Sequence, residues 1–192
     1  ENSLFQLGKI LMLSLITSFG TASIAANAIG NNFAQYQILG GMSVGIAMVT
    51  VVSQCVGAGD YAKVRAYTRK LMKLSYLFII IMVGITLALM PLILRLYNVS
   101  AEADGYAVQC ILLHSAMACV LWPMAFTLPN TLRAAGDARY TMLVSVFVMW
   151  AVRIGVGYLL GGYFGLGLLG VWSAMALDWA GRIPVFWLRY HG

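Results

Sequence analysis

Charged side chains are scarce in this sequence. Lys, Arg, Asp and Glu together make up 9% of its 192 residues, and the acidic ones number 6. A soluble domain carries about 25% charged residues because its surface faces water. With 61% of its residues hydrophobic, this chain lacks the polar side chains needed to cover a globule. Since helices satisfy their own backbone hydrogen bonds in lipid, we predict an all-α integral membrane protein.

Cysteine is also rare, and it is not paired. Cys55, Cys110 and Cys119 lie inside apolar stretches without paired spacing, which excludes a disulfide framework and indicates buried thiols. The sequence has no His, Cys and Asp cluster at metal-ligand spacing, no Gly-rich phosphate loop and no nucleophile beside a base. We therefore predict that the chain is not an enzyme and that it holds no metal or organic cofactor.

Long uncharged runs are what the sequence has in abundance. No residue between Ile10 and Gly59 is ionisable at neutral pH. A single helix of that length would measure about 75 Å, against a hydrocarbon core of about 30 Å, so the run must hold two spans and a turn near Gly20. The same reasoning along the chain predicts one six-helix transmembrane lobe over residues 1–192, with spans at about 2–20, 26–55, 71–95, 106–131, 139–161 and 166–188.

The basic residues predict the orientation of these spans. They cluster after the second and fourth spans and at the end of the sixth. Because cytoplasmic loops are rich in Lys and Arg, both ends of this segment are predicted to lie in the cytoplasm. The protein itself is predicted to lie in the cell (inner) membrane. Its predicted partner is membrane lipid, not nucleic acid. In a five-span alternative, residues 63–73 lie along the interface. The later basic loops would then lie on opposite sides of the membrane, and the charge asymmetry would be lost. The sequence begins without Met, so we expect it to belong to a longer protein.

Two ionisable residues are predicted to meet inside the bundle. Counting back from the turn near Phe164, Arg153 is level with about residue 175, and Asp178 lies roughly 5 Å further along the axis. Buried charges at membrane depth pair with one another, so Arg153 and Asp178 form a candidate intramembrane pair. Arg182, one turn from Asp178 on the same helix, is the competing partner.

A stripe of amides is the second polar feature. Asn27, Asn31 and Gln35 recur at every fourth residue at the start of the second span, and Gln6 on the first span adds another amide. Amides facing lipid would be left without hydrogen-bond partners, so the stripe must face protein or water. Interhelical hydrogen bonding and the lining of a substrate cavity both explain it.

Three motifs carry a resemblance to a known family. Residues 53–60 (SQCVGAGD), 128–137 (LPNTLRAAGD) and 167–172 (GLLGVW, followed by Asp178 and Arg182) keep the family's order and spacing. On these motifs the chain resembles the MATE (multidrug and toxic compound extrusion) transporters. The resemblance implies the C-terminal six-helix lobe of a twelve-span protein, whose N-terminal lobe is absent from this sequence.

The resemblance also implies a function. Members of this family export organic cations and other amphipathic compounds in exchange for Na⁺ or H⁺, and Glu1 matches an acidic coupling or substrate position. A second acid expected in the fourth span is replaced by Trp122, which puts a Na⁺ site like that of many relatives in doubt. A lipid-linked oligosaccharide flippase with the same two-lobe architecture and a non-transporting membrane module are the alternatives.

Overall fold

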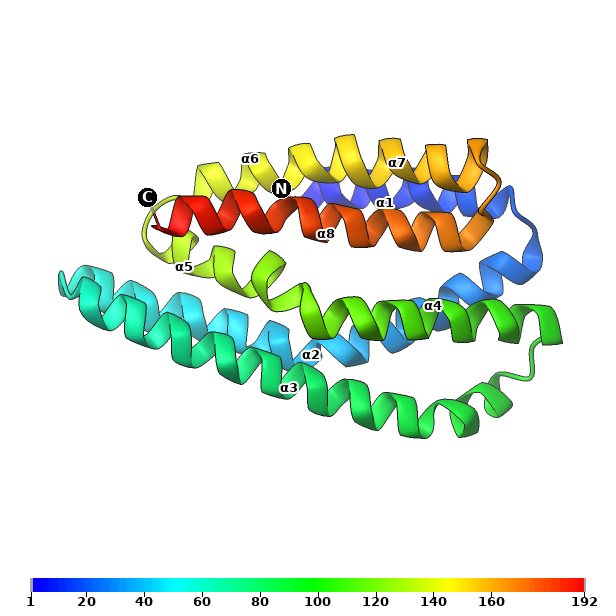
Figure 1. Ribbon diagram of the computed structural model, residues 1–192, viewed down its shortest axis with the longest axis horizontal. Helices are drawn as coiled ribbons and strands as arrows, with labels where there is room; N and C mark the ends of the chain where they lie inside the picture. Colours follow the sequence, from blue (N-terminus) through cyan, green and yellow to red (C-terminus); the bar gives the residue numbers. More distant parts are fainter. Residues whose placement is uncertain (1, 192) are drawn as a thin grey trace.

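The computed structural model describes residues 2–191, which form six helical runs that alternate in direction (Figure 1). The first three runs are single helices, namely α1 (Asn2–Thr17), α2 (Thr21–Gly57) and α3 (Tyr61–Tyr97). Two are composite, made of α4 (Ala101–Val120), η1 (Pro123–Thr127) and α5 (Leu128–Ala134), and of α6 (Ala138–Val148), η2 (Met149–Ile154), α7 (Gly155–Gly157) and η3 (Tyr158–Tyr163). The last run is α8 (Gly167–His191).

The predicted six-helix bundle is confirmed. Residues 63–73, which the five-span alternative lays along the interface, belong to the unbroken helix α3 (Tyr61–Tyr97). By length and composition alone, four stretches among the described residues could cross a bilayer, namely α2, α3, α4 and the run from Ala138 to Tyr163. The helix α1 is shorter, with 16 residues, and α8 carries Asp178 and Arg182 in its apolar stretch. The positions of the membrane boundaries along these helices stay a prediction.

The helices lie in two layers. In Figure 1 the first layer holds α1, α8 and the run from α6 to η3, and the second holds α2, α3 and α4. The helix α2 packs against α3, α4 and α5, while α8 packs against η2 and η3 within its layer and against α4 across it. Large apolar side chains cover the outside, such as Leu96, Phe147 and Tyr163 with 77%, 73% and 82% exposure. Such exposure suits a surface that faces lipid rather than water.

Local signals in the sequence end the helices where the turns occur. The turn after α2 has Gly59 at φ +71°, and the turn after α5 has Gly136 at φ +95°, a backbone conformation that residues with a Cβ rarely adopt. Asp60 caps the start of α3, since its carboxylate accepts a 3.0 Å hydrogen bond from the Lys63 backbone N–H. Both turns and the end of α8 lie at the same end of the bundle in Figure 1. The basic residues beside them therefore gather at one end.

The cap at Asp60 predicts a pH dependence at the start of α3. Hydrogen bonds from the side chain and backbone of Lys63 hold the pKa of the Asp60 carboxyl below its ordinary value. A lowered carboxyl pKa contributes stability that is present above the ordinary pKa and is lost as the pH falls through the lowered one. We expect amide exchange over residues 61–64, corrected for intrinsic rates, to accelerate on acidification. The variant Asp60→Asn keeps a capping oxygen, so its exchange should not change in this range, and equal acceleration in both proteins would contradict the prediction.

Two of the six runs contain π-helical turns. In the fourth run the α-helix ends before Pro123, which begins η1. Proline has no N–H to donate and its ring clashes with the preceding turn, which accounts for the change of winding in this run. The segments η2 and η3 interrupt the fifth run without any proline. Such turns are frequent at functional sites, and Arg153 lies within η2.

Candidate functional site

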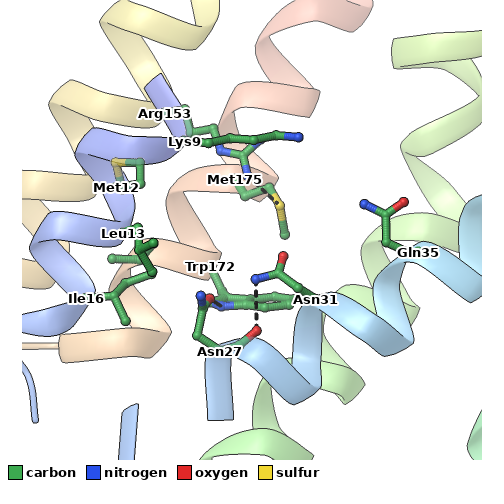
Figure 2. A pocket seen from close by; sticks show the side chains of 11 residues that line it. Lys9, Met12, Leu13, Ile16, Asn27, Asn31, Gln35, Arg153, Trp172 and Met175 are labelled. Carbon is green, nitrogen blue, oxygen red and sulfur yellow. Dashed lines mark hydrogen bonds between the residues drawn. The ribbon is translucent and has the colours of Figure 1, made fainter. Parts of the chain in front are cut away.

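Two adjacent cavities lie between the layers. Their volumes are about 300 Å³ and about 480 Å³, within or near the range of 300–1,000 Å³ typical of small-molecule sites. Both are lined by residues from α1, α2, η2 and α8, and the residues they share are Lys9, Asn31, Gln35, Arg153 and Met175. Figure 2 shows these side chains converging on one open space. The shared residues define what we call the central cavity.

The helix α2 supplies the amide wall of this cavity. Asn27 is buried, and its side-chain oxygen accepts a 3.2 Å hydrogen bond from the indole N–H of Trp172 on α8. Asn31 and Gln35 are exposed, and the Asn31 amide donates to the Asn27 backbone carbonyl at 2.8 Å. Interhelical hydrogen bonding and the lining of a cavity therefore each explain a different part of the amide stripe. Asn27 ties two helices together, whereas Asn31 and Gln35 line the cavity.

The opposite wall carries two basic side chains. Lys9 extends from α1 and Arg153 from η2, and in Figure 2 both reach toward the space bordered by Asn31 and Gln35. The Arg153 guanidinium donates to the Met175 thioether sulfur at 3.3 Å. Lys9 was not predicted as a site residue from the sequence. The signal that could have identified it is its position as a charged residue within an apolar stretch.

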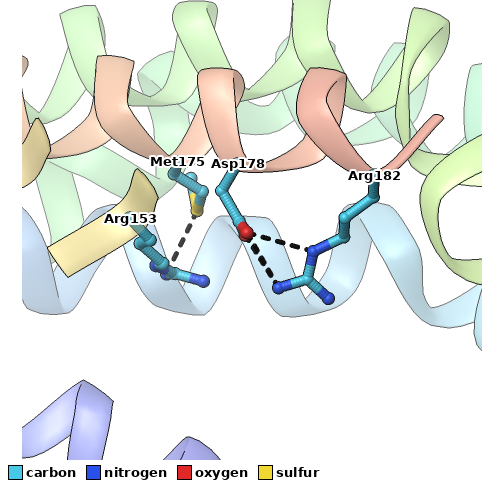
Figure 3. Close-up of polar contacts among 4 residues, drawn as sticks. All are labelled: Arg153, Met175, Asp178 and Arg182. Carbon is cyan, nitrogen blue, oxygen red and sulfur yellow. Dashed lines mark hydrogen bonds and ion pairs between the residues drawn. The ribbon is translucent and has the colours of Figure 1, made fainter. Parts of the chain in front are cut away.

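The predicted Arg153–Asp178 contact is wrong, because Asp178 pairs with the competing partner. Arg182 donates from Nε and Nη2 to Asp178 at 2.9–3.0 Å, and both residues are almost completely buried. Figure 3 shows Asp178 between the two guanidinium groups along α8. A partner one helical turn away on the same helix is held in place by the backbone. Arg153 must reach across from another helix, and it contacts Met175 instead.

A buried polar network beside the cavity was missed by sequence reasoning. The Gln37 amide donates to Ser115 at 2.8 Å and to Thr86 at 3.1 Å, and its oxygen lies 2.6 Å from His114 Nδ1. Since the Gln37 oxygen can only accept, His114 carries its proton on Nδ1 in this arrangement. The imidazole lies edge-on to Trp179, and it lines the larger cavity. The network joins α2, α3 and α4 through hydrogen bonds that are shielded from lipid.

Of the remaining predicted residues, Gln6 is not brought into this cavity. Gln6 is exposed on α1 and lines neither of the two cavities. Glu1 lies outside the described residues. Trp122, which stands where a second acid was expected, is buried against the larger cavity and stacks on Phe126. Within residues 2–191 no group of three or more His, Cys, Asp and Glu side chains could hold a metal ion.

Comparison with known proteins identifies which proteins this chain resembles. The model of the MatE family matches residues 1–159. The probable multidrug resistance protein YoeA of Bacillus subtilis is 26% identical over 169 residues, which cover 88% of this chain and 36% of that protein. The probable multidrug resistance protein NorM of Thermotoga maritima is 26% identical, covering 93% of this chain and 38% of that protein.

A third relative extends the comparison. The probable multidrug resistance protein NorM of Bacillus licheniformis is 29% identical over 195 residues, covering 97% of this chain and 40% of that protein. No solved structure matches this chain significantly. The chain therefore spans less than half the length of the curated relatives it matches.

Proposed function

Because this chain belongs to the MatE family, whose members are membrane transporters and not enzymes, we propose that it is the C-terminal half of a multidrug efflux transporter. The missing half is an N-terminal lobe of the same polypeptide. Together the two lobes export amphipathic organic compounds, organic cations among them, from the cytoplasm. The names of the relatives YoeA and NorM, which denote multidrug resistance proteins, support this proposal.

The observation that carries the proposal is the central cavity. Amide and basic side chains line it in the middle of helices whose outer surfaces are apolar. Polar groups at membrane depth are costly unless they face protein or water. Asn31 and Gln35 are exposed in this half, so in the complete transporter they face either the other lobe or a water-filled passage between the lobes. A substrate site between two lobes that rock against each other has this character.

We propose that transport is driven by exchange with Na⁺ or H⁺, with Glu1 as the coupling or substrate carboxylate. Both ends of the segment lie in the cytoplasm and the protein lies in the cell (inner) membrane. The clustering of basic residues at one end of the bundle supports this orientation. Because position 122 holds Trp122 and not an acid, we expect the carboxylate that binds the coupling ion to be Glu1 or a residue of the N-terminal lobe.

The test uses the full-length protein in inside-out vesicles, with accumulation of the cationic dye ethidium measured under an imposed Na⁺ or proton gradient. We expect gradient-dependent uptake, abolished in Glu1→Gln at unchanged protein level. The matched control is Glu102→Gln, which removes an exposed acid at the first turn of α4 and should leave uptake intact. No uptake of several dyes under either gradient would contradict antiport. Uptake that survives in Glu1→Gln would remove Glu1 from the mechanism.

One observation favours the flippase as a second candidate. Four basic residues line the larger cavity, namely Lys9, Arg133, Arg153 and Arg182. From the sequence, Arg153 was the only arginine expected at depth. Basic side chains in a cavity suit the phosphate groups of a lipid-linked substrate. Movement of a fluorescent lipid-linked oligosaccharide in proteoliposomes, without dye export, would select this alternative.

A further inference from the structure

The charged side chains that line the two cavities within the described part of the chain have one sign. Among the described residues that line the two cavities, none is Asp or Glu, and four are Lys or Arg. Asp178 does not line either cavity, because it is fully buried and turned to Arg182. Arg133 donates to the Asn130 side-chain oxygen at 3.0 Å. Arg153 and Lys9, which line both cavities, are the cations whose charge faces the shared space.

Arg153 has more hydrogen-bonding capacity than its surroundings use. A guanidinium has five N–H donors, and a thioether sulfur is a weak acceptor. Its contact with Met175 at 3.3 Å is to such a sulfur. The Arg153 side chain is half-buried, and the nearby Asp178 carboxylate is hydrogen-bonded to Arg182. An anion that enters the cavity would therefore supply the strong acceptor that the described contacts of Arg153 lack. Arg binds carboxylate, sulfonate and phosphate oxygens through two parallel N–H bonds.

The other walls of the cavity define the rest of the ligand. Lys9 provides a second positive charge, and the Asn31 and Gln35 amides provide donors across from it (Figure 2). Apolar side chains continue from this polar group in both directions. They are Met12, Leu13, Ile16 and Trp172 in the smaller cavity and Ile38 and Phe126 in the larger one. One charged group flanked by apolar walls fits an amphiphile.

From this geometry we propose that Arg153 and Lys9 form a subsite for the anionic group of an amphipathic substrate, whose apolar part lies along α2 and α8. The inference rests on the proposed function, because it assigns a substrate class to the same cavity. The anionic group can belong to a soluble amphiphile or to a lipid headgroup. In either case its oxygens bind the Arg153 guanidinium between η2 and α8.

The experiment measures binding of radiolabelled taurocholate, a sulfonated amphiphile, to the purified full-length protein in phosphatidylcholine nanodiscs. We expect Arg153→Gln and Lys9→Gln each to weaken taurocholate binding about tenfold, the effect of losing one charge-assisted hydrogen bond worth about 1.4 kcal/mol. Arg153→Lys keeps the charge and should lose less. The matched control Arg139→Gln removes an exposed cation in the first turn of α6 and should leave binding unchanged. Ethidium binding should be equal or tighter in Arg153→Gln.

A second arm separates the two sources of the anion. Nanodiscs that contain phosphatidylglycerol should weaken taurocholate binding to the wild type if a lipid headgroup also occupies the subsite, and leave it unchanged if only soluble amphiphiles enter. Either result agrees with the subsite. Taurocholate binding that is absent in the wild type, or equal in the wild type and in both Gln variants, would overturn it. Because binding needs no ion gradient, these outcomes are independent of the ethidium uptake that tests antiport.

Discussion

Arg182→Met is expected to lower the free energy of unfolding of the full-length protein by about 3–5 kcal/mol, because it leaves the Asp178 carboxylate buried without its ion partner. The pair is held by three hydrogen bonds of 2.9–3.0 Å. The Arg182 guanidinium also lies 5.2 Å from the centre of the Phe126 ring. The substitution therefore removes packing as well as charge. Unfolding by SDS titration in mixed micelles measures the effect.

Two further variants separate the charge from the packing. The double variant Asp178→Leu with Arg182→Met removes both charges and should recover most of the lost stability, since apolar residues can replace a buried ion pair at little cost. Arg189→Met removes an exposed cation that pairs with Asp137 at 2.6 Å on the surface, and it should change stability little. A double variant as unstable as Arg182→Met alone would show that packing, and not the unpaired carboxylate, is responsible.

Gly170→Leu is expected to disrupt the packing of α8 against η3, with a loss of at least about 3 kcal/mol. A Cβ at Gly170 would lie 2.7 Å from the backbone nitrogen of Gly161 and 2.7 Å from the carbonyl carbon of Leu160. Both are backbone atoms, so no side-chain rotation relieves the contact and the two helices must separate. Small residues at such crossings let helix backbones approach closely in membranes.

The matched control for this prediction is Gly84→Leu. A Cβ at Gly84 on α3 meets no atom within 4 Å, and the residue is exposed. Leucine also favours helix over glycine by nearly 1 kcal/mol, so this variant should be as stable as the wild type or more so. The two proteins are compared by the amount that remains monodisperse on size exclusion after heating in detergent. A stable Gly170→Leu protein would mean that the close approach of α8 and η3 is not required.

Features with a local cause were predictable from the sequence. Gly20, Gly59 and Gly136 mark turns because they adopt positive φ, and Asp60 caps a helix through its own neighbours. The helix count followed from hydrocarbon thickness and the length of uncharged runs. The helix bounds were predicted less well, since α2 begins at Thr21, inside the predicted turn.

Features that depend on which faces meet could not be derived in the same way. Counting residues placed Arg153 level with residue 175, and the structure has it in contact with Met175. The prediction that Arg153 pairs with Asp178 was wrong because Arg182 reaches Asp178 from the same helix. Gln37 lies off the amide stripe, and its binding to His114 depends on how α2 packs against α4. Periodicity gives the face of a helix, but it does not say which neighbour that face meets.

The π-helical turns have a consequence for how this chain can vary in length. A π turn holds one residue more than an α turn, so a single inserted or deleted residue in η2 (Met149–Ile154) can be absorbed by winding, without breaking the helix. Without that change of winding, deleting one residue would rotate the side chains on one side of that point by about 100° relative to those on the other. A homologue one residue shorter there would keep the fold and present a different side chain to the cavity where this chain presents Arg153.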